Sequence, residues 1–261
     1  MKKTKAFSLI LAILLLAAFV VPALSSCGKD AGTLTLNVYN WGEYISDGSE
    51  ESFNTNAEFE KWYFENSGKR VKVNYTTYAS NEDMYAKLKS GAVRYDIVIP
   101  SDYMIELMIE EDMLEEIDFS NIPNYQYIAP EYRNLFYDPD NRYSIPYTYG
   151  MIGIIYNTSM VEGTPDSWDL MWNEDYKGKI LNFNNPRDAF GTAMYRLGID
   201  VNTTEHSDWD AAFEALKAQK PLVQSYVMDE VFNKMKGASA AIAPYYAGDF
   251  LTMYGDNEDL A

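Results

Sequence analysis

The chain has 261 residues and a formal net charge of −18, from 21 basic and 39 acidic side chains. An acidic surplus of this size disfavours nucleic acid and anionic lipid as partners and raises the local concentration of cations, although acidic charge also serves solubility alone. The 22 tyrosines combine an apolar ring with a polar tip, which suits a wet binding cleft.

Residues 1–27 have the organisation of an export signal. Three lysines within the first five residues precede an almost wholly apolar run from Ala6 to Leu24. Leu24-Ser25-Ser26-Cys27 then matches the lipobox of bacterial lipoproteins. We therefore predict cleavage, lipidation at Cys27, and a protein anchored by lipid in the periplasmic space or on the outer face of the plasma membrane. A transmembrane anchor is the alternative, which Pro22 disfavours.

Strand and helix patterns alternate after a short polar tether at residues 28–32. Alternating or continuous apolar side chains predict strands at 33–39, 71–78 and 96–100. Helical spacing and caps predict helices at 56–66, after Ser80, and at 104–113. This strand–helix order predicts parallel strands in an open, doubly wound sheet.

The alternation is interrupted and then resumes in the second half. Two strand-like runs adjoin at 143–149 and 151–156. The elements predicted beyond them are strands at 179–183, 222–226 and 240–244, and helices at 187–197, 209–218 and 230–236. We predict two α/β lobes, residues 28–147 and 148–261, after the signal segment 1–27.

Several common chemistries have no sequence support. His206 is the sole histidine and lies in a polar stretch, so we predict a solvated loop position without a catalytic or metal role. Cys27, the sole cysteine, leaves no other thiol. Asp138-Pro139-Asp140-Asn141 predicts a turn, because a calcium loop needs an acid where Tyr149 stands. We predict no catalytic residue, cofactor or metal; paired carboxylates of a lipid-anchored hydrolase stay an alternative.

Aromatic and polar residues follow five predicted strands directly, at the strand ends where open sheets bind ligands. Ser101 and Asp188 also fit helix caps. The residues at these five strand ends are Trp41, Gly42, Glu43 and Tyr44; Ser101, Asp102 and Tyr103; Asn184, Asn185, Arg187 and Asp188; Ser225 and Tyr226; Tyr245 and Tyr246.

At these residues the sequence resembles the spermidine/putrescine-binding proteins of bacterial polyamine ABC importers. The likeness extends from about Thr33 to Phe250. The matching stretches are Tyr39–Tyr44, Tyr75–Glu82, Met84–Leu88, Tyr95–Tyr103, Tyr143–Tyr147, Ser167–Trp172 and Tyr176–Gly178.

The resemblance implies an α/β, two-lobe periplasmic-binding-protein fold of type II that closes on its ligand. It implies a monomer that binds a polyamine and delivers it to ABC importer permease subunits, with no nucleic acid partner and no enzymatic activity. The implied ligand contacts are ring walls at Trp41, Tyr44 and Tyr245, polar contacts at Ser101, Tyr103 and Ser225, and Asn185 and Asp188 where the family carries two acids.

Two departures from the family pattern affect this expectation. Asn185 replaces an acid and weakens one amine anchor. The chain also ends before the family's later tryptophan, its most important amine-pairing aspartate and the return of the chain to the first lobe. We therefore expect an incomplete second lobe of poor stability and weak or absent binding. A receptor for ferric iron, thiamine or a quaternary amine is an alternative within the binding class.

Overall fold

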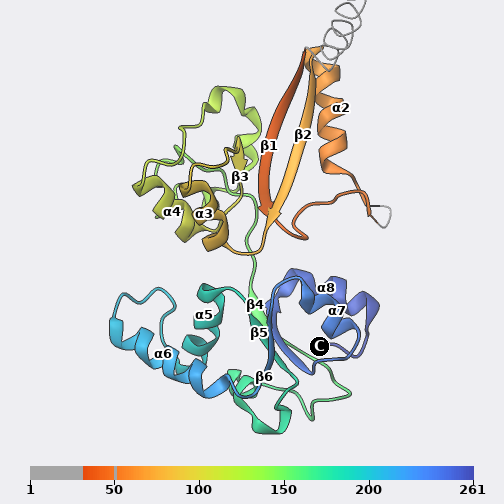
Figure 1. The fold of residues 1–261 in the computed structure, drawn as a ribbon, viewed down its shortest axis with the longest axis vertical. Coiled ribbons are helices and arrows are strands. Elements are labelled where there is room, and N and C mark those ends of the chain that lie inside the picture. The colour runs from red at the N-terminus through yellow and green to blue at the C-terminus, as the bar shows by residue number, and fades with distance from the viewer. Residues whose placement is uncertain (1–31, 50–51) are drawn as a thin grey trace, which may run out of the picture. The chain divides into compact units, whose positions relative to one another are not determined.

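The computed structural model describes residues 32–49 and 52–261 (Figure 1). The predicted signal segment and the lipidation site at Cys27 lie outside the described residues. No helix within the described part is long and apolar enough to cross a membrane. Two compact units make up the fold. Unit 1 comprises the described residues up to 39 with 44–76 and 94–98, and unit 2 comprises 40–43, 77–93 and 99–261.

A three-stranded sheet and one helix form the framework of unit 1. The strand order is β2-β1-β3, with β1 (Thr33–Trp41) parallel to β3 (Ile97–Val98) and β2 (Arg70–Tyr78) at the edge. Helix α2 (Thr55–Ser67) follows β1 and buries none of its residues. The predicted strands and helix are confirmed, with β3 reduced to two residues. The last residues of β1 and β2 belong to unit 2.

Helices α3 (Asn81–Lys89) and α4 (Asp102–Glu110) belong to unit 2. The predicted cap of α3 is confirmed, since Ser80 Oγ accepts a hydrogen bond from Asp83 N at 3.1 Å. Ser101 occupies the N-cap position of α4, but its side chain makes no capping hydrogen bond. The Ser101 hydroxyl is therefore not occupied by helix capping.

The chain between α4 and the second sheet is a long loop with short 3-10 turns, and the strand predicted at 143–149 is wrong. Asp138, only 3% exposed, explains the difference. Its carboxylate accepts hydrogen bonds from the backbone N of Arg142, Tyr143 and Ser144 at 2.8–3.0 Å. These bonds fold the chain back on itself, which confirms the turn predicted at Asp138.

The sheet of unit 2 has the strand order β4-β7-β5-β6. Strand β5 is parallel to β6 and β7, whereas β4 is antiparallel to β7, so the sheet is mixed rather than wholly parallel. The four strands are β4 (Ile152–Tyr156), β5 (Ile180–Phe183), β6 (Val223–Val227) and β7 (Ile242–Tyr246). Strand β7 begins two residues later than predicted, which places Tyr245 and Tyr246 within the strand.

Helices lie on both sides of this sheet (Figure 1). Leu181 and Phe183 of β5 pack in a core cluster with residues of α7 and α8, while Asn182 points the other way and donates to Gln219 of α6 at 2.7 Å. The helices are α5 (Pro186–Leu197), α6 (His206–Gln219), α7 (Glu230–Lys236) and α8 (Ala247–Asp256). His206 is exposed, but it begins α6 instead of lying in a loop. The lobe boundary after residue 147 stays a prediction.

Candidate functional site

Asp188 lies in the first turn of α5, directly after β5, and is partly buried. Asn185 is the N-cap of this helix, because its Oδ1 accepts from Arg187 N at 3.0 Å. Two donors hold one oxygen of Asp188: Asn185 Nδ2 donates to Oδ2 at 3.0 Å and Tyr246 Oη donates to it at 2.6 Å. Asp188 Oδ1 accepts no hydrogen bond from a described residue. The protein thus orients this carboxylate and leaves half of its acceptor capacity unused.

The pKa of Asp188 is raised above the ordinary carboxyl value. Burial is the largest cause, and the charge of Glu82 adds to it. The hydrogen bond from Tyr246 and the charge of Arg187 act in the opposite direction without cancelling the rise. The surroundings therefore do not fully compensate the negative charge of Asp188.

A second carboxylate, Glu82, lies in the first turn of α3 and contacts Tyr103 of α4. Tyr103 Oη donates to Glu82 Oε1 at 3.0 Å and accepts from Asn81 Nδ2 at 2.9 Å. Asn81 Oδ1 in turn accepts from Ser101 N at 3.2 Å. The guanidinium carbon of Arg187 lies 5.0 Å from the centroid of the Tyr103 ring, in a cation–π contact. One face of this ring therefore already binds a cation.

A second group of acids comprises Glu43, Asp229 and Asp249. Glu43 follows β1, Asp229 precedes α7, and Asp249 lies in the first turn of α8. Burial raises the pKa of Asp249 to about 6, with the charges of Asp229 and Glu43 as further causes. Burial followed by the charges of Glu43 and Glu230 raises the pKa of Asp229. Mutual repulsion within this group makes it a site of strongly negative potential.

Gly42 allows the backbone after β1 to approach Asp229 closely. A Cβ atom added at Gly42 would collide with the Asp229 carboxylate, so any other residue would force this side chain to move. Glycine at position 42 therefore lets the Asp229 carboxylate lie directly against the backbone after β1.

Aromatic rings connect the two acidic groups at the end of β7. Tyr245 is 3% exposed and its ring centroid lies 5.0 Å from that of Tyr246, the residue bonded to Asp188. Burial raises the pKa of the Tyr245 phenol, and the charges of Asp229 and Asp249 raise it further. Trp41 packs against the core cluster that contains Tyr245. Apolar ring surface thus lies between two groups of negative charge.

Helix N-termini explain how the fold tolerates these like charges. Glu82, Asp188 and Asp249 occupy the first turns of α3, α5 and α8. The positive end of the helix macrodipole stabilises a carboxylate there by about 0.3–1 kcal/mol. None of the five carboxylates forms an ion pair with a lysine or arginine of the described chain. The site is therefore a set of partly stabilised anions that a cation would complete.

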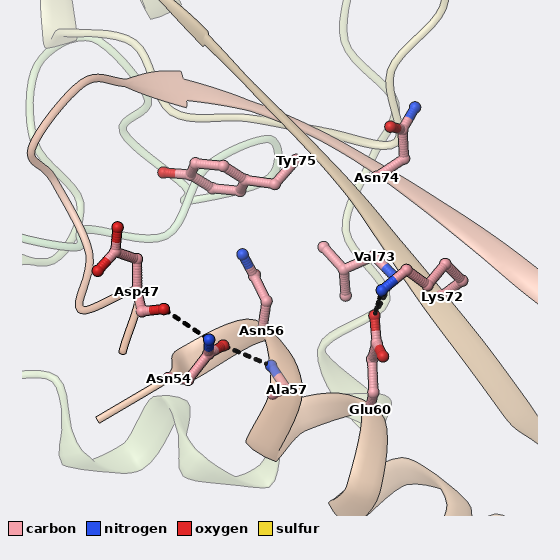
Figure 2. A pocket seen from close by; sticks show the side chains of 9 residues that line it. All are labelled: Asp47, Asn54, Asn56, Ala57, Glu60, Lys72, Val73, Asn74 and Tyr75. Carbon is pink, nitrogen blue, oxygen red and sulfur yellow. Dashed lines mark hydrogen bonds and ion pairs between the residues drawn. The ribbon is translucent and has the colours of Figure 1, made fainter. Parts of the chain in front are cut away.

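A separate pocket of about 380 Å³ lies in unit 1, and Figure 2 shows its lining. Its polar groups contact one another: Asn54 Oδ1 accepts from Ala57 N at 2.9 Å, and Lys72 Nζ pairs with Glu60 at 3.0 Å (Figure 2). None of the nine lining residues is a predicted site residue. In the part of the chain that the structure describes, no group of three or more His, Cys, Asp or Glu side chains could hold a metal ion.

Comparison with known proteins shows the family to which this chain belongs. The sequence profile described as bacterial extracellular solute-binding protein matches residues 94–253. The chain belongs to this family. Two relatives of this solute-binding protein are the spermidine/putrescine-binding periplasmic protein of Salmonella typhimurium and the putrescine-binding periplasmic protein of Escherichia coli. The first is 37% identical over 223 residues, covering 84% of this chain and 60% of the relative. The second is 30% identical over 229 residues, which cover 82% of this chain and 59% of the relative.

Solved structures agree with the α/β, two-lobe periplasmic-binding-protein fold predicted from the sequence. A spermidine/putrescine ABC transporter protein of Listeria monocytogenes superposes with a TM-score of 0.76 at 35% identity, covering 87% of this chain and 67% of the other. A lipoprotein of Treponema pallidum superposes with a TM-score of 0.73 at 30% identity. The superposition covers 87% of this chain and 69% of the lipoprotein. This solute-binding protein spans about 60% of the length of its Salmonella relative.

Most of the predicted ligand residues come together in unit 2. Asn185 and Asp188 are hydrogen-bonded to each other, and Tyr103 approaches Asp188 closely enough for the Asp188 charge to raise the Tyr103 pKa, after the larger effect of burial. Trp41 and Tyr245 share the core cluster of β7. Their roles as ligand contacts stay predictions.

Two predicted residues, Ser225 and Tyr44, lie apart from this group. Ser225 lies within β6, paired with Leu181 of the core cluster, and its buried hydroxyl has no hydrogen-bond partner among the described residues. Tyr44 is half-buried and belongs to unit 1. Tyr245 is the more enclosed of the two adjacent tyrosines, and the phenol that reaches Asp188 is that of Tyr246.

Five residues of this site were not among the predicted contacts: Glu43, Glu82, Asp229, Tyr246 and Asp249. Asp229 and Asp249 come two or three residues after β6 and β7, so the strand-end rule could have found them. Glu82 could not be found in this way, since its position depends on Tyr103 from another helix.

We predict that Asp249 makes folding stability depend on pH. Its folded pKa of about 6 exceeds the ordinary value of 3.8, so between these values the folded state binds more protons than the unfolded state. Stability therefore falls as pH rises from about 4 to about 6, and this contribution is constant above the window. Asp249→Asn removes this fall, so the variant gains stability relative to the unaltered protein as pH rises through the window. Urea unfolding at pH 4, 5, 6 and 7.5 measures the difference.

Asp166→Asn is the matched control, because Asp166 is exposed in the same unit. Its stability difference from the unaltered protein should stay constant over this range. A constant difference for Asp249→Asn as well would contradict the raised pKa.

Proposed function

We propose that this solute-binding protein binds an alkyl diamine or polyamine, of the putrescine and spermidine class, outside the cytoplasm and delivers it to an ABC importer. The arrangement that supports the proposal is the pair of acidic groups, Glu82 with Asp188 and Glu43 with Asp229 and Asp249, on either side of the Tyr245–Tyr246 rings. A protonated polyamine has the complementary pattern, because its charged nitrogen atoms are separated by apolar methylene groups.

Each part of the site has a counterpart in such a ligand. Ammonium groups would compensate carboxylates whose pKa burial has raised, and a compensated carboxylate returns toward its ionised form. Methylene groups would lie on ring faces, where each ammonium–ring contact contributes about 0.5–2 kcal/mol. The relatives named for spermidine and putrescine support the same ligand class.

The proposal includes a binding role without catalysis. The named relatives are solute-binding proteins. We infer that this chain works as a monomer that closes on its ligand and contacts permease subunits. The alternatives to a polyamine receptor are receptors for ferric iron, thiamine or a quaternary amine. Each would bind a different ligand, so a panel of ligands separates them.

Thermal shifts with putrescine, spermidine, choline, thiamine and Fe³⁺ test the ligand class. Stabilisation follows RT ln(1 + [L]/Kd), so the ranking of the shifts gives the ranking of affinities. We expect the two polyamines to give the largest shifts. Asp188→Asn should weaken putrescine binding by about thirtyfold, since removing one member of a buried charge pair costs about 2 kcal/mol or more.

Asp166→Asn, which removes the same charge from an exposed position of unit 2, is the control and should bind putrescine normally. A larger shift with choline, thiamine or Fe³⁺ than with either polyamine would refute the assignment. Equal putrescine affinity in Asp188→Asn and the unaltered protein would remove Asp188 from the site.

We also propose that lipid at Cys27 anchors the protein to the membrane. The lipobox order of residues 24–27 supports this, as does the likeness to a lipoprotein of Treponema pallidum. A glyceride with two acyl chains plus a third acyl group holds a protein stably at a bilayer. Cys27→Ser should leave the protein unlipidated and shift it from the membrane fraction of expressing cells. Radiolabelled palmitate in the Cys27→Ser product would show that the lipid lies elsewhere.

A further inference from the structure

The carboxylate of Glu82 has one oxygen that the protein leaves without a hydrogen-bond partner. Oε1 accepts from Tyr103 Oη at 3.0 Å, whereas Oε2 is buried and has no partner among the described residues. A buried polar atom without a partner costs about 1–3 kcal/mol, and more when it carries charge. Such atoms are rare in folded proteins, so this one requires an explanation.

The neighbouring side chains do not supply the missing donor. Asn81 Nδ2 donates to Tyr103 Oη at 2.9 Å, and the Tyr103 hydroxyl proton is used in the bond to Oε1. Burial, the largest cause, together with the charges of Glu82 and Asp188 raises the pKa of Tyr103, so its phenol stays a donor at neutral pH. The hydrogen bonds that link Asn81, Tyr103 and Glu82 thus leave only Glu82 Oε2 without a donor.

Asp188 contributes a second unused acceptor to the same surroundings. Its Oδ2 is occupied by Asn185 and Tyr246, while Oδ1 receives no hydrogen bond from a described residue. The charge of Glu82 acts on Asp188, and both charges act on Tyr103. The two carboxylates therefore share one electrostatic environment around the Tyr103 ring.

The nearest cation does not complete this arrangement. Arg187 stacks over the Tyr103 ring at 5.0 Å and over the Trp209 ring at 5.9 Å. It forms no ion pair with Glu82 or Asp188 in the described structure. The missing partner of Oε2 must be a hydrogen-bond donor, and next to a second carboxylate it should carry positive charge.

We propose that Glu82 is a further ligand-binding residue, and that Oε2 of Glu82 and Oδ1 of Asp188 together bind one primary ammonium group. This inference rests on the proposed function and specifies its ligand class. A primary ammonium group has three N–H donors, whereas a quaternary ammonium group has none. Glu82 therefore selects amines with N–H ends against methylated cations of the same charge.

Calorimetric titration of Glu82→Gln tests this selection. The ligands are putrescine and its analogue with two trimethylammonium ends, which has the same charge and chain length. The unaltered protein should bind putrescine at least about tenfold more tightly than the analogue, because the analogue leaves Oε2 without a donor. Glu82→Gln should weaken putrescine binding by about tenfold or more and reduce the preference over the analogue.

Asp83→Asn is the matched control, since it removes an exposed charge from the same turn of α3. Its putrescine affinity should stay within about twofold of the unaltered value. Equal weakening in Asp83→Asn and Glu82→Gln would assign the effect to long-range charge and overturn the inference. If Glu82→Gln does not fold, Glu82→Asp takes its place, with the same expected loss of preference.

The outcomes separate this inference from the proposed function. Unchanged putrescine affinity and preference in Glu82→Gln, with weakened binding in Asp188→Asn, overturn the role of Glu82 and leave polyamine binding standing. Failure of the unaltered protein to bind putrescine or spermidine, under conditions in which choline, thiamine or Fe³⁺ binds, overturns both.

Discussion

Incompletely compensated negative charge at the ends of β-strands organises the candidate site. Asp188, Asp229 and Asp249 are each held in surroundings that disfavour their charge, with burial as the main cause. Asp188 and Asp249 are only partly exposed, and a fold selected for stability alone would expose such groups fully or pair them with lysine and arginine. Their retention in a common region is the feature that a cationic ligand explains, because the ligand supplies the compensating charge.

The architecture makes this arrangement possible in two ways. Parallel strands followed directly by helices bring the first turns of α5 and α8 to one edge of the sheet, where the helix dipoles reduce the cost of each carboxylate. Hydrogen bonds then fix the acids before a ligand arrives, as Tyr246 and Asn185 do for Asp188. A preorganised site loses less conformational freedom on binding and so retains more of its interaction energy.

The Asn185 side chain shows what an amide contributes at a position where the resemblance predicts an acid. An acid at this position would stand beside Asp188 and repel it, whereas the Asn185 amide donates a hydrogen bond to the Asp188 carboxylate and also caps α5. With asparagine at position 185 the site has one carboxylate fewer, and the remaining carboxylate of Asp188 is held by an additional hydrogen bond.

The elements with strong periodicity could be predicted from the sequence, and apart from the strand at 143–149 the predicted strand–helix order agrees with the structure from β1 to β7. The strand at 143–149 could not, because its apolar alternation is overridden by the hydrogen bonds of Asp138. The site was predictable where residues follow strands, as with Asp188. Both Tyr245 and Tyr246 follow a predicted strand, and only the structure shows that the Tyr246 phenol reaches Asp188. The position of Glu82 depends on contacts between helices that no local pattern encodes.

Proton release on binding shows whether a cationic ligand supplies the missing charge at Asp249. At pH 6 Asp249 is about half protonated, and an ammonium ligand favours its ionised form, so binding should displace up to about half a proton. Calorimetric titration of putrescine at pH 6 in buffers of different ionisation enthalpy measures this number. The account predicts net release that disappears in Asp249→Asn, and putrescine binding without any proton release at pH 6 would contradict it.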